Sequence, residues 1–312
     1  MKRPFLGYVA MGLAAVGLVA SVGCTRVPTL EEHQTQQSHK SARLTTPVIA
    51  QEGVLTVGIN TASAPLAMTD AEGYLDGYAV DLACSIADEL GLAIQFVNAG
   101  DASVALTEKN ADLYIGTSNM DPETSKDLHV AGTVYTEAMG VFGKHDTRST
   151  VSVDQLAGAT IAVQEESESF KMLMDSGIES SVVQCSNINE CFDALFAGEA
   201  DYVICNAVAG AYLSRANAEV NLCGVFGDAD TYGIATSSLD LKSEVNMVLD
   251  ELSNNGVLNA IFVRWFGDAP VDMSSLVIEG VEFAAQDEET SEDGEEAEDS
   301  EASADETAGT SR

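Results

Sequence analysis

A glycine-bearing turn followed by an amphipathic helix, over residues 73–91, constrains the fold of this chain more than any other segment. The turn, Gly73-Tyr-Leu-Asp-Gly77, follows an apolar strand candidate at residues 54–59. Apolar side chains then recur at roughly helical spacing over residues 80–90, and Gly91 is a typical residue to end a helix. A strand, a turn and a helix in this order predict the opening βα unit of an α/β domain.

Short apolar strand candidates alternate with helix-length amphipathic segments along the chain as far as Gly267. The strand candidates lie at residues 54–59, 94–97, 113–116, 160–163, 181–184 and 202–205. This alternation indicates α/β layers with largely parallel strands. Roughly 215 residues between Gln51 and Gly267 are enough for two small lobes, each with its own core.

Residues 73–91 and a series of later motifs resemble the amino-acid-type (family 3) extracellular solute-binding proteins of ABC importers. Asp121-Pro-Glu123 is similar to the family's T-P-E turn, and Leu156-Ala-Gly-Ala-Thr-Ile-Ala-Val163 to its L-x-G-K-x-V-x-V segment. Ala194-Leu-Phe-Ala-Gly-Glu-Ala-Asp201 and Arg264-Trp-Phe-Gly267 are similar to its later A-L-x-x-G-x-x-D-A and K-W-F-G motifs. The motifs occur in the family's order, and the resemblance covers nearly all of residues 51–268.

The resemblance implies an α/β fold of the two-lobed, periplasmic-binding-protein-like kind (type II), with two hinge crossings between the lobes. We expect hinges at the glycine-bearing segments 140–143 and 227–233, because glycine absorbs large changes in backbone angle. Solute would bind in the cleft, between loops at the carboxyl ends of strands. The implied segments are lobe 1 at residues 51–140 and 234–270, lobe 2 at residues 141–233, and a C-terminal extension at residues 271–285.

The two ends of the chain have the composition of an export signal and of a disordered tail. Residues 1–23 combine a basic start, an apolar run and small residues before Cys24, which resembles a bacterial lipobox. Acylation of Cys24 would anchor the protein to the outer face of a membrane, with residues 24–50 as a flexible tether. The alternative is an ordinary signal peptide followed by an incidental cysteine. Residues 286–312 are acidic and contain no aromatic residue, so we expect an acidic disordered tail.

The net charge of the chain limits the classes of partner that it can bind. Asp and Glu number 50 against 14 Lys and Arg, which gives a formal net charge of −36. Such a protein repels nucleic acid and anionic membrane surfaces, so nucleic acid is excluded as a partner. The resemblance implies a small-molecule solute and ABC permease subunits as partners, and we expect the protein to be a monomer.

Motifs for catalysis, cofactors and metal ions are missing from the sequence. Ser167 has no His and Asp partners placed by a known pattern, His129 fits a surface or packing role, and no glycine-rich phosphate loop occurs. Six cysteines form no CxxC pair, and no histidine cluster accompanies them, which argues against zinc. We therefore expect no enzyme activity, no cofactor and no metal. One or two local disulfides are consistent with the remaining cysteines, Cys84, Cys185, Cys191, Cys205 and Cys223.

The pocket positions depart from the family's pattern. The family's arginine after T-P-E, which binds the α-carboxylate of an amino acid, aligns with Thr124. The aspartate that binds the ammonium group aligns with Asn206, so both charges are replaced by neutral side chains. The predicted ligand-binding residues are Asn60, Ser63, Ala99, Thr117, Asn119, Asp121, Thr124, Gln164, Ser167 and Asn206.

Three explanations of these replacements are open. The cleft no longer serves transport, or Lys126 supplies the missing cation, or the solute is not a plain zwitterionic amino acid. We favour the third, because the replaced positions leave a roomier cleft lined by neutral donors and acceptors. The sequence thus predicts the substrate-binding lipoprotein of an ABC importer, anchored at the extracytoplasmic face of the cell membrane, for a small, polar, amino-acid-related solute. The alternative is a membrane-anchored sensor or surface interaction protein that keeps the scaffold without transport.

Overall fold

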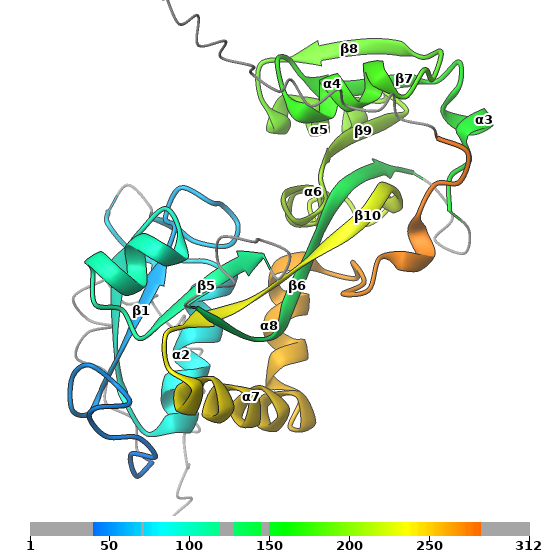
Figure 1. Ribbon diagram of the computed structural model, residues 1–312. Helices are drawn as coiled ribbons and strands as arrows, with labels where there is room; N and C mark the ends of the chain where they lie inside the picture. Colours follow the sequence, from blue (N-terminus) through cyan, green and yellow to red (C-terminus); the bar gives the residue numbers. More distant parts are fainter. Residues whose placement is uncertain (1–39, 70–71, 119–127, 145–149, 282–312) are drawn as a thin grey trace, which may run out of the picture.

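The computed structural model describes residues 40–69, 72–118, 128–144 and 150–281, whose main feature is one eight-stranded mixed sheet (Figure 1). Its strand order is β4-β1-β5-β10-β6-β9-β7-β8, and β2 (Met68–Thr69) and β3 (Leu75–Asp76) form a separate small ribbon. The predicted signal segment, Cys24 and the acidic tail lie outside the described residues. The strands of the main sheet are β1 Val54–Ile59, β4 Ala93–Asn98, β5 Leu113–Ser118, β6 His129–Gly143, β7 Thr160–Gln164, β8 Ser181–Cys185, β9 Tyr202–Asn206 and β10 Asn221–Thr236.

The two halves of the main sheet repeat one topology, and each half is a lobe. β1 pairs in parallel with β4 on one side and β5 on the other, and β7 pairs in parallel with β8 and β9 in the same way. The long strands β6 and β10 run antiparallel to each other and join both halves. Figure 1 shows two bodies connected by these two strands. The predicted two-lobed α/β fold with two crossings is confirmed.

Helices pack on the sheet in both lobes. α2 is the helix predicted before Gly91, which ends it with a left-handed backbone at φ 70°. α2, α7 and α8 contact one another in the first lobe. None of the described helices combines the length and the apolar character that crossing a bilayer requires. The helices are α2 Tyr78–Leu90, α3 Val153–Leu156, α4 Glu168–Asp175, α5 Ile188–Ala197, α6 Ala207–Ser214, α7 Leu239–Asn254 and α8 Val257–Phe266, with helical turns at η1 Val104–Glu108 and η2 Ser274–Leu276.

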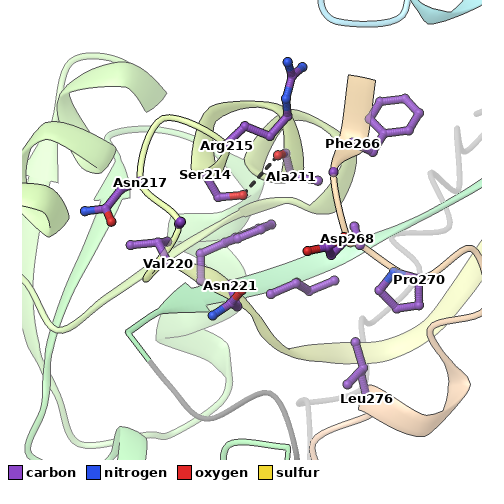
Figure 2. A pocket seen from close by; sticks show the side chains of 15 residues that line it. Ala211, Ser214, Arg215, Asn217, Val220, Asn221, Phe266, Asp268, Pro270 and Leu276 are labelled. Atoms are coloured by element: carbon purple, nitrogen blue, oxygen red, sulfur yellow. Dashed lines mark hydrogen bonds between the residues drawn. The ribbon is translucent and has the colours of Figure 1, made fainter. Parts of the chain in front are cut away.

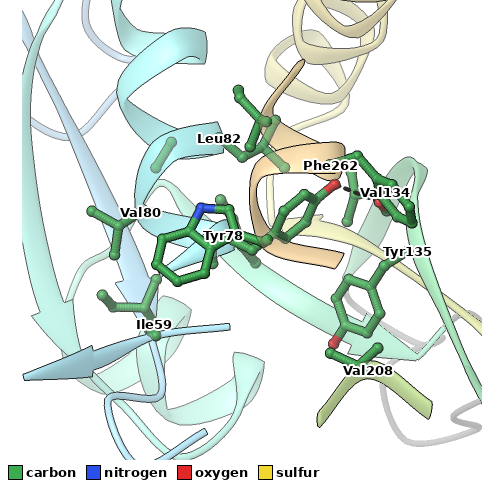
Figure 3. Packing of buried hydrophobic residues seen from close by; sticks show 14 of the residues in the cluster. Ile59, Tyr78, Val80, Leu82, Val134, Tyr135, Val208 and Phe262 are labelled. Carbon is green, nitrogen blue, oxygen red and sulfur yellow. Dashed lines mark hydrogen bonds between the residues drawn. The ribbon is translucent and has the colours of Figure 1, made fainter. Parts of the chain in front are cut away.

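An aromatic cluster in the core fixes the first lobe to the crossing strands (Figure 3). The ring of Tyr78, at the start of α2, meets Tyr135 of β6 and Phe262 of α8 edge to face, each at 6.2 Å between centroids. The Tyr78 hydroxyl donates to the carbonyl of Val134. Trp265, from the Arg264-Trp-Phe-Gly267 motif, is 4% exposed and belongs to the same core. This aromatic packing fixes β6 against the first lobe. It therefore also fixes the side chains that follow Tyr135 on this strand.

The hinge lies where the pairing between β6 and β10 is interrupted. The register shifts between Phe226 and Asp230 of β10, opposite residues 137–139 of β6, and shifts again after Tyr232. An interrupted ladder places fewer constraints on backbone angles, so we expect one lobe to rotate against the other in this region. The interruption falls within the predicted hinge segment 227–233.

The predicted hinge segment 140–143 lies in a part of β6 that is paired on both sides, and the glycines there have a packing role. Gly140 is paired on both sides, with β9 and with β10. A Cβ added at Gly140 would lie 3.2 Å from Cα of Ala207, and one added at Gly210 would lie 2.1 Å from the ring of Phe142. These glycines therefore let α6 lie directly on β6. In a sequence, a glycine that allows close approach between elements has the same signature as a glycine in a hinge.

Residues 40–50 pack on the first lobe, so the predicted tether was drawn too long at its C-terminal end. Ile49 is 1% exposed, and the amide of Ala50 donates to Oδ1 of Asp112 at 2.7 Å. The Arg43 guanidinium pairs with Glu251 of α7 at 2.7 Å. A segment this short has no periodicity that would have revealed its buried side chains. Residues 24–39 stay a predicted tether.

None of the five cysteines in the described part of the chain forms a disulfide, so the local disulfides expected from the sequence are not formed in this structure. Cys185, at the end of β8, and Cys191, in α5, are hydrogen-bonded to each other. Burial raises the pKa of the Cys191 thiol to about 12, which keeps it protonated and unreactive near neutral pH.

Candidate functional site

A cavity of about 380 Å³ lies between the two lobes, beside the hinge. Its walls come from the loops after β1 and β4, from β5, β6 and β10, and from the start of α6. In a sheet of this kind the loops at the carboxyl ends of parallel strands form the ligand site. The lining residues are Asn60, Ser63, Ala64, Leu66, Ala67, Ala79, Gly100, Tyr114, Ile115, Gly116, Tyr135, Glu137, Asn206, Val208, Ala209 and Tyr232. We call this the interlobe cavity.

Three of the predicted ligand-binding residues meet in the interlobe cavity. Asn60 and Ser63 belong to the turn that follows β1, where Oδ1 of Asn60 accepts from the amide of Ala62 at 3.0 Å. Asn206 ends β9 on the second lobe and caps α6, since its Oδ1 accepts from the amide of Ala209 at 3.0 Å. The cavity therefore joins polar side chains from both lobes.

Two predicted residues of the first lobe are buried rather than open to the cavity. Ala99 is 4% exposed, and its neighbour Gly100 lines the cavity instead. Thr117 is 6% exposed, and its hydroxyl has no hydrogen-bond partner within the described structure. β5 therefore contributes Tyr114 and Gly116 to the wall, where the sequence predicted Thr117.

Gln164 and Ser167 of the second lobe do not reach the interlobe cavity. Gln164 is exposed, and Ser167 caps α4, accepting from the amide of Phe170 at 3.2 Å and donating to the carbonyl of Gln164 at 2.6 Å. These side chains lie where the second lobe would meet a solute only after turning toward the first. The predicted residues Asn119, Asp121 and Thr124, and also Lys126, lie outside the described residues.

Glu137 is the charged residue that the sequence analysis missed. It lies on β6 at the hinge, and it is the one charged side chain among the described residues that line the interlobe cavity. Its Oε1 accepts from the amides of Ala138 at 3.1 Å and Val208 at 3.3 Å. The side-chain amide of Asn206 also donates to this carboxylate. A single Glu inside the otherwise apolar segment 134–143 was the available signal for this residue.

The environment of Glu137 favours its protonated form. Desolvation by the surrounding protein raises the pKa of Glu137 to about 7, although hydrogen bonds from Asn206 and from backbone amides act in the opposite direction. A carboxyl group with a pKa near 7 changes charge within the physiological range. Titratable groups with shifted pKa values are common at functional sites.

Three tyrosines form an aromatic wall of the interlobe cavity next to Glu137. Tyr135 of β6 and Tyr232 of β10 are stacked, with centroids 4.8 Å apart and planes inclined by 7°. The Tyr114 hydroxyl donates to the carbonyl of Gly100 at 3.0 Å, which fixes the ring of Tyr114 across the loop after β4. All three rings come from strands of the main sheet and none from a loop.

A second cavity, of about 810 Å³, lies at the other end of α6 (Figure 2). It is bordered by the end of α6, the start of β10 and the segment after α8, including Asn221, Asp268 and Leu276. Figure 2 shows the Arg215 side chain directed away from Asn221 and Leu276. None of the predicted ligand-binding residues lines this cavity, so its larger volume does not make it the solute site. Among the described residues, no group of His, Cys, Asp or Glu is arranged to hold a metal ion.

Comparison with protein families decides the class of this two-lobed structure. The model of the bacterial extracellular solute-binding proteins, family 3, matches residues 55–268, more than half of the chain. This chain belongs to that family. Its members capture solutes outside the cytoplasm and work with the permease components of ABC importers.

Curated relatives of this family 3 protein are amino-acid-binding components of ABC transporters. The ABC transporter glutamine-binding protein of Bacillus subtilis is 22% identical over 281 residues, which cover 87% of this chain and all of the relative. A probable amino-acid ABC transporter-binding protein of Haemophilus influenzae is 27% identical over 220 residues, 68% of this chain and 84% of the relative.

Solved structures agree with the fold of this family 3 protein. A polar amino acid ABC uptake transporter substrate-binding protein from Streptococcus thermophilus superposes with a TM-score of 0.61 at 18% identity, covering 69% of this chain and 86% of that one. The L-cystine solute receptor of Neisseria gonorrhoeae, in its unliganded open conformation, gives 0.59 at 18% identity, covering 75% and 99%. Both likenesses show the shared two-lobed fold.

Proposed function

We propose that this solute-binding protein delivers a small, polar, amino-acid-related solute to an ABC importer, and that the solute is not a plain zwitterionic amino acid. The lining of the interlobe cavity carries this proposal. Asn60, Ser63 and Asn206 offer neutral donors and acceptors, Glu137 offers a negative charge, and the described lining residues include no Arg or Lys. Among its described residues, the cavity thus offers an anion to a solute and no Arg or Lys.

The lack of Arg and Lys among the described lining residues argues against a free amino acid as the solute. The α-carboxylate of an amino acid would enter a cavity in which the charged side chain described is the carboxylate of Glu137. A buried charge without a partner is strongly unfavourable. Asn206 stands where the family's ammonium-binding aspartate aligns, so the second charged contact of a zwitterion receptor is also changed. An amide or hydroxyl on the solute would satisfy Asn60 and Ser63 without a charge.

Capture would follow from closure of the two lobes. The solute would contact the first lobe and the hinge, and the exposed side chain of Gln164 and the half-buried Ser167 would reach it when the second lobe turns. A ligand that bridges both lobes binds the closed arrangement better and shifts the population toward it. The interruption between β6 and β10 allows this rotation.

We place the protein at the extracytoplasmic face of the cell membrane, anchored through Cys24. The small residues and the cysteine that follow the apolar run support acylation at this position. A diacylglyceryl group provides two chains, which stable membrane attachment requires. Cys24→Ala should release the protein from the membrane fraction into the soluble fraction. An unchanged distribution would contradict the anchor.

A thermal-shift screen of the purified protein tests the proposed function. The panel would hold amino acids, amines, short peptides and nucleosides, since a ligand at about 100 times its Kd adds roughly 2.7 kcal/mol of stability. We expect a stabilising solute among the amine-bearing polar compounds and none among ordinary amino acids. A micromolar Kd for an ordinary amino acid would contradict the proposed solute class.

Two alanines offer matched variants that locate the binding cavity. Ala64 is exposed and lines the interlobe cavity, and Ala218 is exposed and lines the second cavity. Ala64→Trp should fill the first space and abolish solute binding, whereas Ala218→Trp should leave it unchanged. The opposite result would move the solute site to the second cavity.

A further inference from the structure

We infer that the interlobe cavity is built for an organic cation, an amine or quaternary ammonium group that Glu137 holds beside the tyrosine wall, and that the solute needs no carboxylate. This inference rests on the proposed function, because it names the solute class of the same cavity. It concerns the hinge strand β6 rather than the loops to which the family resemblance points.

The first support is the uncompensated charge of Glu137. The groups that donate to its carboxylate are neutral: the backbone amides of Ala138, Ala207 and Val208 and the side chain of Asn206. The described lining residues include no base that would balance the ionised form. A cation in the cavity would supply this balance through a charge-assisted hydrogen bond. The empty cavity is therefore electrostatically complementary to an ammonium group.

The second support is the aromatic wall. Tyr114, Tyr135 and Tyr232 come from three neighbouring strands and line the same cavity as Glu137. The stack between Tyr135 and Tyr232 holds these rings rigidly, with centroids 4.8 Å apart. Electron-rich rings attract cations, and cages of rings bind quaternary ammonium groups in other proteins. A wall of rings next to one carboxylate favours a cation over a neutral solute of the same shape.

The third support is the relation between Glu137 and Asn206. The Asn206 amide donates to the Glu137 carboxylate, so the two side chains are in direct contact. A carboxylate at position 206 would repel Glu137, because like charges this close are not both ionised. Asn206 and Glu137 therefore fit together as a pair in which the negative charge sits on the hinge strand. The solute's cation would accordingly lie near the hinge.

Glu137 also has a structural contact that a test must separate from ligand binding. Its carboxylate ties β6 to the start of α6 through the amide of Val208. Glu137→Gln keeps an oxygen that accepts this bond, and it removes the charge and exchanges the second oxygen for an amide donor. The matched control is Asp230→Asn, because Asp230 pairs with Glu137 in the β6–β10 ladder but is exposed and does not line the cavity.

The experiment is isothermal titration of the full-length protein with pairs of probes that differ in charge but not in shape. Choline is compared with 3,3-dimethyl-1-butanol, its uncharged carbon isostere, and putrescine with 1,4-butanediol. All titrations are run at physiological salt, so that the general attraction of cations to an acidic surface is screened. The wild-type protein should prefer at least one cation over its neutral isostere by about tenfold to a hundredfold, the range of one charge-assisted contact.

The variants then locate this preference. Glu137→Gln should lower the affinity for the cation by about tenfold to a hundredfold and leave that for the neutral isostere unchanged, whereas Asp230→Asn should change neither. The inference is overturned if the wild-type protein binds the cation and its isostere with equal affinity. It is also overturned if Glu137→Gln still prefers the cation over the isostere.

The proposed function can fail separately. If a neutral solute from the thermal-shift panel binds in the interlobe cavity and the cations do not, the transport role stands and the cation inference is overturned. If neither the panel nor the probes bind, both are overturned.

Discussion

The indole ring of Trp265 stacks on the ring of Tyr212, with centroids 5.9 Å apart and planes inclined by 23°. Trp265 belongs to α8 of the first lobe and Tyr212 to α6 of the second, so this contact joins the lobes. Nη1 of Arg215 donates to the carbonyl of Trp265 at 3.2 Å in the same place. The contact exists while Gln164 and Ser167 are still outside the cavity. We infer that it stabilises this arrangement of the lobes, which we interpret as open, over a closed one.

Tyr212→Ala should raise the affinity for the transported solute. Without the ring contact, less free energy separates the open arrangement from the closed one that binds, and an aromatic pair contributes about 0.5–1.5 kcal/mol, or up to roughly tenfold in Kd. Calorimetric titration measures the Kd, and small-angle scattering without solute should show a more compact protein. Met174→Ala, an exposed change on α4, is the control. A weaker affinity in Tyr212→Ala would show that the contact belongs to the closed arrangement.

Truncation should locate the N-terminal boundary of the folded unit. A chain that begins at residue 40 should be as stable as one that begins at residue 25, whereas a chain that begins at residue 51 loses Ile49 from the core and the Arg43–Glu251 pair. We expect a loss of about 3–5 kcal/mol from lost burial and from Asp112 left without one donor. Urea unfolding of the three chains measures this difference. Equal midpoints for all three would mean that residues 40–50 do not stabilise the lobe.

The architecture was predictable because it depends on local patterns. The segment before Gly91 shows both the helical spacing of its buried side chains and the glycine that ends α2, and both appear in the structure. Strands β1 and β5 are apolar runs of the length that buried parallel strands need. Such signals are contained in a dozen residues, so no knowledge of distant contacts is needed to recognise them.

The site was predictable only in part, because it depends on contacts between distant segments. Asn60 and Asn206 follow strands, and the rule for parallel strands places both at the cleft. Glu137 lies within a strand, and the sequence does not tell which face of the strand a single polar residue occupies next to an interrupted ladder. Its neighbour Asn206 is 69 positions away in the sequence. Only the pairing of β6 with β9 brings the two together.

The stability of the solute-free protein should fall as the pH rises from about 4.5 to 7, by an amount that depends on Glu137. Burial raises the pKa of Glu137 from an ordinary 4.5 to about 7, so the folded state binds the proton more tightly than the unfolded chain does in this window. The stabilisation by the bound proton is complete below the pKa of the unfolded chain and is lost as the pH passes the pKa of the folded state. It contributes at most roughly 3 kcal/mol to the free energy of unfolding.

Glu137→Gln should remove this part of the pH dependence, as urea unfolding at several pH values would show. The titratable groups packed around Glu137 are Tyr135, Tyr232 and Cys205, and burial raises the pKa of each, so they stay neutral in this window. Asp230, its partner on β10, is exposed. Parallel curves for the wild type and the variant would mean that Glu137 titrates in its ordinary range.

Moving the carboxylate from position 137 to position 206 should preserve cation binding. In the double variant Glu137→Gln with Asn206→Asp, the amide and the carboxylate exchange places across the same hydrogen bond, and an aspartate still caps α6. We expect its affinity for the cation to lie within about tenfold of the wild type, whereas Glu137→Gln alone loses about tenfold to a hundredfold. Titration of both variants with the cation that the wild type prefers measures the difference.

Asn206→Asp alone is the control: it places two carboxylates together and should raise the pKa of the pair further. If the double variant binds the cation no more tightly than Glu137→Gln alone, the cation is bound only by a carboxylate on the hinge strand.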